Sequence, residues 1–193
     1  MQKIAYIIPG AGESYRRQKG YNKIGEFFKE KGIKPIQVEV DWHSKKSHQF
    51  EYWTSQFLKK YKKPKNTKVY VLGFSFGAVI AFLSEPKLRP DGLILCSLSP
   101  YFIEDHQKLP KAWLAWWRKN IKGSDYSFNE LAPNVRSKTY LVFGDLEPSV
   151  VKPRMKAAKR MIKNSSLFMV RGGKHRISQK EYLDKVKKVI EKL

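Results

Sequence analysis

The sequence predicts an α/β fold in which a mainly parallel sheet is flanked by helices on both faces. Short segments rich in Val, Ile, Leu, Tyr and Phe have few polar interruptions, as expected for strands buried on both faces of a parallel sheet. Segments with apolar residues at helical spacing fall between them, and this alternation is typical of βαβ units. The length of 193 residues fits one domain over residues 1–193, because single cores commonly hold about 100–200 residues.

Strands and helices are expected to alternate along the chain. The expected strands, each a short apolar run, are Ile4–Ile8, Pro35–Val40, Lys68–Leu72, Gly92–Ser97, Thr139–Phe143 and Leu167–Val170. The expected helices are Tyr21–Lys31, Phe50–Tyr61, Phe76–Leu83, Val151–Ile162 and Lys180–Leu193. The third helix is a short apolar run, whereas the last two carry apolar residues on one face and lysines on the other. The connection from Pro100 to Pro133 is longer than the others.

The composition excludes several classes of protein. Hydrophobic residues make up 41% of the chain, which is ordinary for a globular protein and excludes a disordered or low-complexity chain. The single cysteine, Cys96, excludes an internal disulfide, and its place in an expected strand predicts a buried, inert thiol. No apolar run approaches the roughly 20 residues of a membrane span, and the N-terminal apolar stretch is too short for a signal peptide. We therefore expect a cytoplasmic protein.

The charge balance is unusual for this length. Lys and Arg number 39 against 17 Asp and Glu, which gives a net charge of +22. Such a charge predicts attraction to nucleic acid, an anionic membrane or an acidic protein partner. The lysines are spread over nearly every segment, and no nucleic-acid-binding motif is present. A solvated, lysine-rich surface is therefore the favoured interpretation, and a functional basic surface is the alternative.

The segment Val69–Ala78 places the pattern G-x-S-x-G between an expected strand and an expected helix. A serine on such a tight turn has strained backbone angles, and Gly73 and Gly77 remove side chains that would clash there. The hydroxyl of Ser75 is then held at the C-terminal edge of the sheet and at a helix N-terminus, where developing negative charge is favoured. A strand before the pattern and a helix after it are the context required of a nucleophile elbow.

A serine nucleophile needs a base and an acid that orients the base. Among the 4 histidines, His175 follows a late expected strand directly, in a glycine-rich loop, and His43 after the second strand is the reserve candidate. The other two, His48 and His106, are interpreted as surface loop residues. Two acids follow the strand Thr139–Phe143 and compete for the third role, Asp145 and Glu147.

With these residues in place, the sequence resembles the α/β-hydrolase superfamily over almost its whole length. Four motifs occur in the family's order: Ile7-Ile8-Pro9-Gly10-Ala11-Gly12, Gly73-Phe74-Ser75-Phe76-Gly77, Gly144–Val150, and Gly172-Gly173-Lys174-His175. Pro9 stands where the family usually has histidine, and Phe74 where histidine is common. The resemblance implies a minimal six-stranded, mainly parallel sheet in the order 2-1-3-4-5-6, without the extra N-terminal antiparallel strands of larger members.

The resemblance also implies roles for individual residues. Ser75 is expected as the nucleophile and His175 as the base, in the family's order of serine, acid and histidine. The backbone N–H groups of Ala11 and Phe76 are expected to form the oxyanion hole. The family's acid register, G-x-x-D-x-x-V, selects Glu147. Small members with an aspartate directly after the glycine favour Asp145 instead, so Asp145 stays the alternative.

Substrate selection is expected in a lid-like or helical connection at about residues 100–133, where the family often inserts lid elements. Trp113, Trp116 and Trp117 lie at i, i+3 and i+4, so they share one helical face. This face either packs the helix onto the sheet or forms an aromatic wall for substrate. The residues expected to line a hydrophobic pocket are Gly10, Trp42, Phe74, Trp113, Trp116 and Trp117.

The expected activity is hydrolysis of a carboxylic ester with a small, medium or aromatic acyl group through an acyl-enzyme. One alternative is a thioesterase acting on an acidic acyl-carrier partner, because a positive surface would raise the rate of association. The other alternative is a catalytically silent binding protein on the same fold. Neither a metal nor a cofactor is expected, since no metal-ligand cluster appears and Tyr15 replaces the last glycine of a G-x-G-x-x-G pattern.

Overall fold

The computed structural model describes residues 1–11, 15–43, 49–121 and 126–193, and the side chains at 15–17, 116, 117 and 120 lie outside this description. The described strands form a six-stranded parallel sheet in the order β2-β1-β3-β4-β5-β6. Its strands are β1 (Gln2–Ile8), β2 (Lys34–Gln37), β3 (Thr67–Phe74), β4 (Gly92–Cys96), β5 (Lys138–Gly144) and β6 (Ser165–Val170). The expected fold class and strand order are confirmed.

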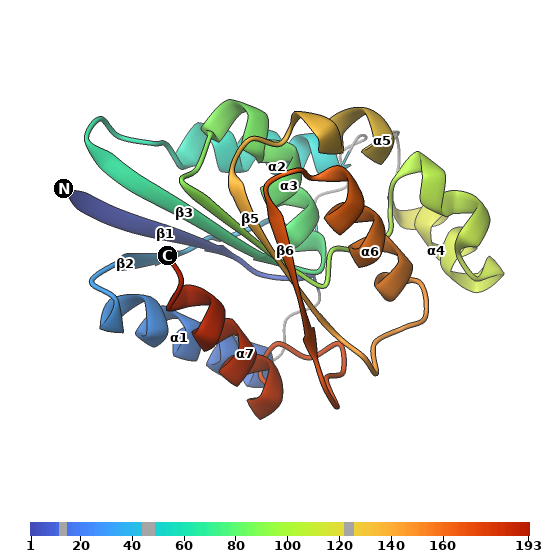
Figure 1. Cartoon of the computed structure of the whole chain (residues 1–193). Helices are drawn as coiled ribbons and strands as arrows, with labels where there is room; N and C mark the ends of the chain where they lie inside the picture. Colours follow the sequence, from blue (N-terminus) through green and yellow to red (C-terminus); the bar gives the residue numbers. More distant parts are fainter. Residues whose placement is uncertain (12–14, 44–48, 122–125) are drawn as a thin grey trace.

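Helices cover both faces of this sheet (Figure 1). One face carries α1 (Tyr15–Glu30) and α7 (Lys180–Ile190), which pack through a core that includes Tyr21, Phe28 and Tyr182. The other face carries α2 (Gln49–Lys60), α3 (Phe76–Leu88) and α6 (Val151–Met161). Strand residues alternate between the two cores, so both faces are apolar, as a parallel sheet requires. Within the described residues, no helix is long and apolar enough to cross a membrane.

Several expected boundaries differ from the observed ones, most of them by one to three residues. The second strand ends at Gln37 rather than Val40, although the N–H of Val38 still donates to the Ile7 carbonyl at 2.9 Å. The first helix begins at Tyr15 rather than Tyr21. The third helix continues to Leu88 rather than Leu83 because the polar Glu85 is buried, and its carboxylate accepts the N–H groups of the segment before β5. A buried acid with its own backbone partners leaves no pattern in the local sequence.

The connection after β4 is built mostly of short helices. They are η1 (Ile103–Lys108), α4 (Lys111–Asn120), α5 (Phe128–Leu131) and η2 (Ala132–Asn134), and α4 lies apart from the strands at the right of Figure 1. The buried side chains of Asp105 on η1 and Arg154 on α6 form an ion pair, with Arg154 Nε 3.0 Å from Asp105 Oδ2. The guanidinium also lies over the ring of Phe128, 4.1 Å from its centroid. This contact anchors the connection to the rest of the molecule.

Replacing Arg154 with methionine would remove the counter-ion of a buried carboxylate. We expect the free energy of unfolding to fall by about 3–5 kcal/mol, the usual cost of breaking a buried ion pair from one side. Urea unfolding followed by tryptophan fluorescence measures this change. Lys180→Met is the control, because it breaks the exposed pair with Asp184 and should leave the midpoint nearly unchanged. Similar midpoints for the two variants would show that the Arg154 pair does not anchor the connection.

Candidate active site

Ser75 lies on the tight turn between the end of β3 at Phe74 and the start of α3 at Phe76. Its φ angle is 55°, which is a strained conformation for a residue with a side chain. The turn is possible because the flanking glycines contact backbone directly. A Cβ atom at Gly73 would lie 2.2 Å from the Gly77 carbonyl oxygen, and one at Gly77 would lie 2.3 Å from the Ile8 and Pro9 carbonyl oxygens. Gly73 therefore lets the turn close on itself, and Gly77 lets it lie against the end of β1.

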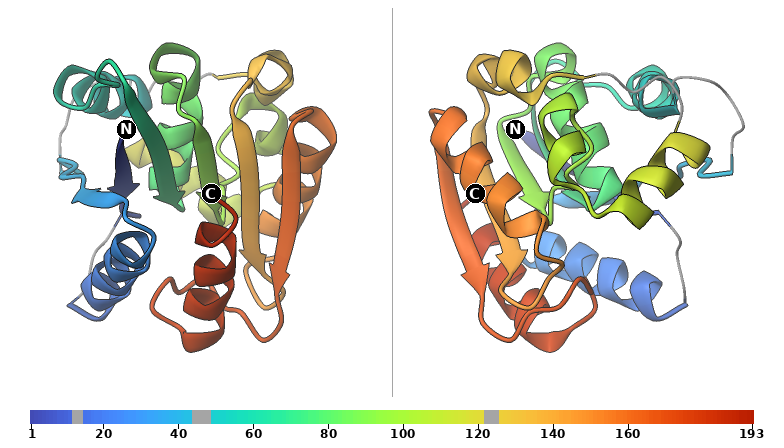
Figure 2. Two further views of the ribbon diagram at one scale, coloured as in Figure 1. Left: turned by 60° about the vertical axis from the view of Figure 1, so that its left-hand side comes forward. Right: turned by 90° about the vertical axis from the view of Figure 1, so that its right-hand side faces the viewer.

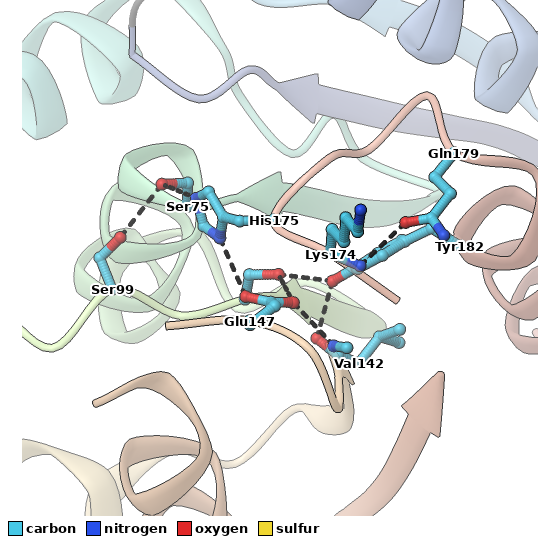
Figure 3. Close-up of polar contacts among 10 residues, drawn as sticks. Ser75, Ser99, Val142, Glu147, Lys174, His175, Gln179 and Tyr182 are labelled. Atoms are coloured by element: carbon cyan, nitrogen blue, oxygen red, sulfur yellow. Dashed lines mark hydrogen bonds and ion pairs between the residues drawn. The ribbon is translucent and has the colours of Figure 1, made fainter. Parts of the chain in front are cut away.

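His175 and Glu147 complete a hydrogen-bonded chain that begins at Ser75 (Figure 3). His175 Nε2 is 3.0 Å from Ser75 Oγ, and His175 Nδ1 is 2.9 Å from Glu147 Oε2. Both distances are those of good hydrogen bonds. The reserve base His43 is exposed and donates its backbone N–H to Asp41, while His48 lies outside the described residues.

The carboxylate at this site belongs to Glu147, and its side chain is only 1% exposed. Oε1 accepts the backbone N–H of Gly144 at 2.7 Å and the hydroxyl of Ser97 at 2.6 Å, while Oε2 faces His175. These partners compensate the carboxylate for the water it has lost. The alternative acid, Asp145, is exposed, and its backbone N–H donates to Val170. Of the two candidates, Glu147 is the one aimed at the imidazole.

The loops that carry Glu147 and His175 meet through glycines. A Cβ atom at Gly144 would lie 2.1 Å from the Gly173 carbonyl oxygen, and one at Gly173 would lie 2.9 Å from Gly144 Cα. The histidine loop is also held by Gln179, whose side chain accepts the Lys174 N–H and donates to the Gly172 carbonyl, both at 2.8 Å. The backbone that leads into His175 is therefore held in place.

A hydroxyl pair lies behind Glu147 and was not anticipated from the sequence. Ser97 is fully buried, directly follows β4 and has a φ of 51°. Its Oγ is 2.6 Å from the hydroxyl of Tyr182, which also lies 3.1 Å from the Val142 carbonyl oxygen. Since the Ser97 proton goes to Glu147, Tyr182 must donate to Ser97, and it shares its one proton between Ser97 Oγ and the Val142 carbonyl oxygen. Burial, with Cys96 and Glu147 nearby, raises the pKa of Tyr182 well above its usual value, so the phenol keeps the proton it donates.

A second hydroxyl, which was not predicted from the sequence, contacts the nucleophile itself. Ser99 is 4% exposed, and its Oγ lies 3.2 Å from Ser75 Oγ. If the Ser75 proton points to His175, Ser99 must be the donor in this contact. The only sequence signal was position, since Ser97 and Ser99 lie just beyond the end of a strand that neighbours the nucleophile's strand.

The two expected oxyanion donors belong to segments that border the nucleophile. Phe76 is the first residue of α3, directly after Ser75. The loop after β1 also approaches Ser75, because a Cβ atom at Gly10 would lie 3.2 Å from Ser75 Cβ. Ala11, the next residue, is half-buried. The structure thus brings the β1 loop and the start of α3 to the same side of the sheet edge as the nucleophile.

The expected pocket residues are divided between two environments. Phe74 is buried in the core on the α7 side, and its ring lies 4.9 Å from that of His175, so it supports the imidazole rather than an open pocket. Trp42 is half-buried, with its ring 6.2 Å from Phe76. Trp113 packs partly buried against the core on the α3 side. The side chains of Trp116 and Trp117 lie outside the described part of the chain.

The remaining chemistry-bearing groups do not form a second centre. Cys96 is fully buried, and burial, with Glu147 adding to it, raises the pKa of its thiol. A thiol of this kind is a poor nucleophile. Among the residues that the structure describes, no group of three or more His, Cys, Asp or Glu side chains is arranged to hold a metal ion.

Comparison with known proteins identifies the fold. No protein-family model and no curated protein sequence matches this chain. Solved structures do match. Est1E from Butyrivibrio proteoclasticus is 16% identical, with 99% of this chain and 86% of that chain covered and a TM-score of 0.75. The α/β hydrolase enzyme MGS-MChE2, from the metagenome of lagoon sediments at Mar Chica, Morocco, is 17% identical, with 100% and 90% covered and a TM-score of 0.72.

A mouse protein, α/β hydrolase domain-containing protein 10, is also similar, at 15% identity with 98% of this chain and 88% of that chain covered and a TM-score of 0.71. Together these similarities show that the chain has the α/β-hydrolase fold, as the sequence motifs predicted.

The glycine contact between the two loops can be tested directly. Gly144→Ala would force a Cβ atom to within 2.1 Å of the Gly173 carbonyl oxygen, so we expect a loss of about 3 kcal/mol in the free energy of unfolding, at the upper end for overpacking. Gly172→Ala is the control. It has a φ of 68° but no atom within 4 Å, and should cost only about 1 kcal/mol of backbone strain. Urea unfolding distinguishes the two, and an equal loss would mean that the contact is not tight.

Proposed function

We propose that this protein is a serine hydrolase that cleaves a carboxylic ester through an acyl-enzyme on Ser75. The observation that carries the proposal is the hydrogen-bonded chain from Ser75 through His175 to Glu147, built on a strained turn between a strand and a helix. This is the geometry of a nucleophile, its base and the acid that orients the base.

In the first half of the proposed reaction, Ser75 Oγ attacks the ester carbonyl carbon while its proton passes to His175 Nε2. Glu147 keeps the Nδ1 proton in place and stabilises the imidazolium that forms. The carbonyl oxygen gains negative charge and is stabilised by the N–H groups of Ala11 and Phe76. Collapse of the tetrahedral intermediate breaks the bond to the alcohol, which leaves with the proton from His175.

In the second half, a water molecule attacks the acyl carbon and gives its proton to His175. The bond to Ser75 Oγ then breaks, and His175 returns the proton to this oxygen, so the acid is released and the enzyme restored. Ser99 Oγ lies 3.2 Å from the same oxygen, and because Ser75 Oγ carries no proton in the acyl-enzyme, Ser99 is then the donor in this contact. We infer that this bond stabilises Ser75 Oγ when it carries negative charge as the leaving group, and that Ser99 favours deacylation.

Aromatic side chains near the nucleophile favour an apolar or aromatic acyl group. The ring of Phe76 lies 5.0 Å from that of Tyr101 and 6.2 Å from that of Trp42. Phe76 and Tyr101 are largely buried and Trp42 is half-buried, so the parts of these rings that remain exposed would give apolar surface beside the reacting carbonyl. One of the similar structures, Est1E, was solved with ferulic acid bound, which supports an aromatic acyl group as one substrate class to test here.

The proposal is tested by labelling with a fluorophosphonate, a probe that reacts with activated serine hydroxyls. Intact-mass measurement should show one adduct on the wild type and none on Ser75→Ala. If the wild type is labelled, its rates of hydrolysis are then measured on a panel of esters and acyl thioesters of varied chain length. A preference for thioesters would favour the thioesterase alternative. A folded wild type that takes no label would favour a catalytically silent binding protein on this fold.

The choice of acid gives a second test. Glu147→Gln preserves shape but removes the charge that holds the correct tautomer of His175, so we expect labelling and ester hydrolysis to slow by about 10³- to 10⁴-fold. Asp145→Asn, two residues away and exposed, should change neither rate more than about twofold, as is usual for a surface substitution. Steady-state ester hydrolysis with both variants measures this. A larger loss in Asp145→Asn would assign the acid role to Asp145.

A further inference from the structure

A basic face on α6 has no acidic counterpart nearby. No Asp or Glu occurs between Glu147 and Glu181. Within this segment the exposed cations of α6 and its C-terminal end are Lys152, Lys156, Lys159, Arg160 and Lys163. They recur at intervals of three and four residues, so they share one helical face. In the described part of the chain, none of them forms an ion pair.

The uncompensated cations of this face lower the stability of α6 in the isolated protein. Like charges four residues apart repel on a helix, and Lys152 in the first turn also opposes the helix dipole. The other lysine-rich helices are built differently. On α7, Lys180 pairs with Asp184 and Lys187 pairs with Glu30. On α1, Lys23 pairs with Glu26. The uncompensated face on α6 therefore favours an anionic partner.

The same side of the molecule presents an open strand edge. β6 pairs with β5 and is the outermost strand of the sheet (Figure 2). The carbonyls of Asn164 and Val170 accept bonds from the β5 side. In a parallel ladder the backbone groups of alternate residues point to opposite sides, so those of Leu167 and Met169 point outward. Among the described residues they have no backbone partner.

β6 lacks the features that usually protect an edge. Its sequence, Ser-Ser-Leu-Phe-Met-Val, has no charge and no proline, and Met169 is 42% exposed. The opposite edge is protected: β2 is four residues long and carries Lys34 and Pro35. Because Val38 bonds inward to Ile7, Pro35 occupies an outward position, where it removes the free N–H.

The basic face and the open edge are contiguous. Lys159 Nζ lies 2.8 Å from the Ser165 carbonyl oxygen, which is the first outward acceptor of β6. Exposed cations also stand at the two ends of the strand, Lys163 before it and Arg171 after it. A second copy of this chain would bring the same positive face and a net charge of +22 against this edge, so self-pairing is opposed by repulsion.

We propose that the open edge of β6 binds an extended acidic polypeptide segment as an added strand, with its carboxylates neutralised by the α6 face. Backbone hydrogen bonds to Leu167 and Met169 supply the register, and the lysines select for charge. The site is independent of the proposed hydrolase chemistry, since it uses none of its residues.

Binding is measured by fluorescence anisotropy in the Ser75→Ala background, so catalysis plays no part. The probe is a fluorescein-labelled octapeptide of alternating Glu and Val, and its matched controls carry Lys in place of Glu or a central proline. We expect the acidic peptide to bind at low salt and to weaken at least tenfold by 0.5 M salt, on the order expected for screened charges. The two control peptides should not bind.

Two variants separate charge from strand addition. Lys156→Glu with Arg160→Glu should weaken binding at least tenfold, whereas Lys188→Glu with Lys192→Glu on the α7 side changes the net charge equally and should have little effect. Met169→Pro removes one outward N–H without breaking a bond to β5 and should also weaken binding at least tenfold. Hydrogen exchange provides a readout that needs no variant: the peptide should slow exchange of the Leu167 and Met169 amides.

Three results would overturn the proposal. Unchanged exchange at Leu167 and Met169 in the presence of bound peptide would mean that no strand is added. Tighter binding of a ten-nucleotide oligothymidylate that is insensitive to Met169→Pro would make the face a nucleic-acid site. A dimer that forms with rising protein concentration and is abolished by Met169→Pro would make a second copy the occupant of the edge.

Discussion

Direct contact between backbones at the C-terminal edge of the sheet is the constraint on which the site depends. Gly77 sits against the carbonyls that end β1, and Gly144 sits against the carbonyl of Gly173. A single methyl group at either position would push apart loops that carry Ser75, Glu147 and His175. The parallel sheet delivers these loops to one edge, and the glycines let their backbones come into direct contact there. The absence of side chains at these positions is what allows hydrogen bonds of 3.0 and 2.9 Å to form.

The buried carboxylate of Glu147 links this edge to the last helix of the chain. A charged group with 1% exposure is stable only if protein donors replace its water. Ser97 is one such donor, and Ser97 is in turn held by Tyr182 on α7. Tyr182 is itself fully buried in the core between α7 and the sheet. Packing of the C-terminal helix therefore helps to orient Glu147, which lies in the loop directly after β5.

The sequence was informative where chemistry and local geometry coincide. The G-x-S-x-G turn is short, and its glycines have a steric reason visible in the sequence, so Ser75 could be identified before its partners. The order of strands and the preference for Glu147 came from the resemblance to a family, because residues alone left Glu147 and Asp145 equivalent. The two acids differ in the direction of their side chains. Glu147 points inward to His175, whereas Asp145 is exposed.

Contacts between distant segments were not predictable from one sequence. Ser97 and Ser99 look like ordinary loop serines, and their importance arises from what other elements place beside them. The same holds for the connection after β4, where a lid-like insertion was expected. Its position depends on Asp105 and Arg154, which are 49 residues apart in the sequence and give no periodic signal. Trp113 packs against the core, as expected if the tryptophan face packs the helix onto the sheet. The side chains of Trp116 and Trp117 lie outside the described part of the chain.

The two edges of the sheet show how charge and backbone geometry act together. Within the described residues β2 and β6 are the outermost strands of the sheet, and unpaired strand edges invite association. At β2 the chain solves this locally, with a short strand and a proline in an outward position. At β6 the strand itself carries neither charge nor proline, and Lys159 covers only the first outward carbonyl, so self-association is opposed mainly by longer-range forces. A net charge of +22 supplies such a force, since two copies repel before their edges can meet. The unusual lysine content and the unprotected edge are thus consistent with one another: the charge that keeps identical chains apart leaves the edge available to a segment of opposite charge.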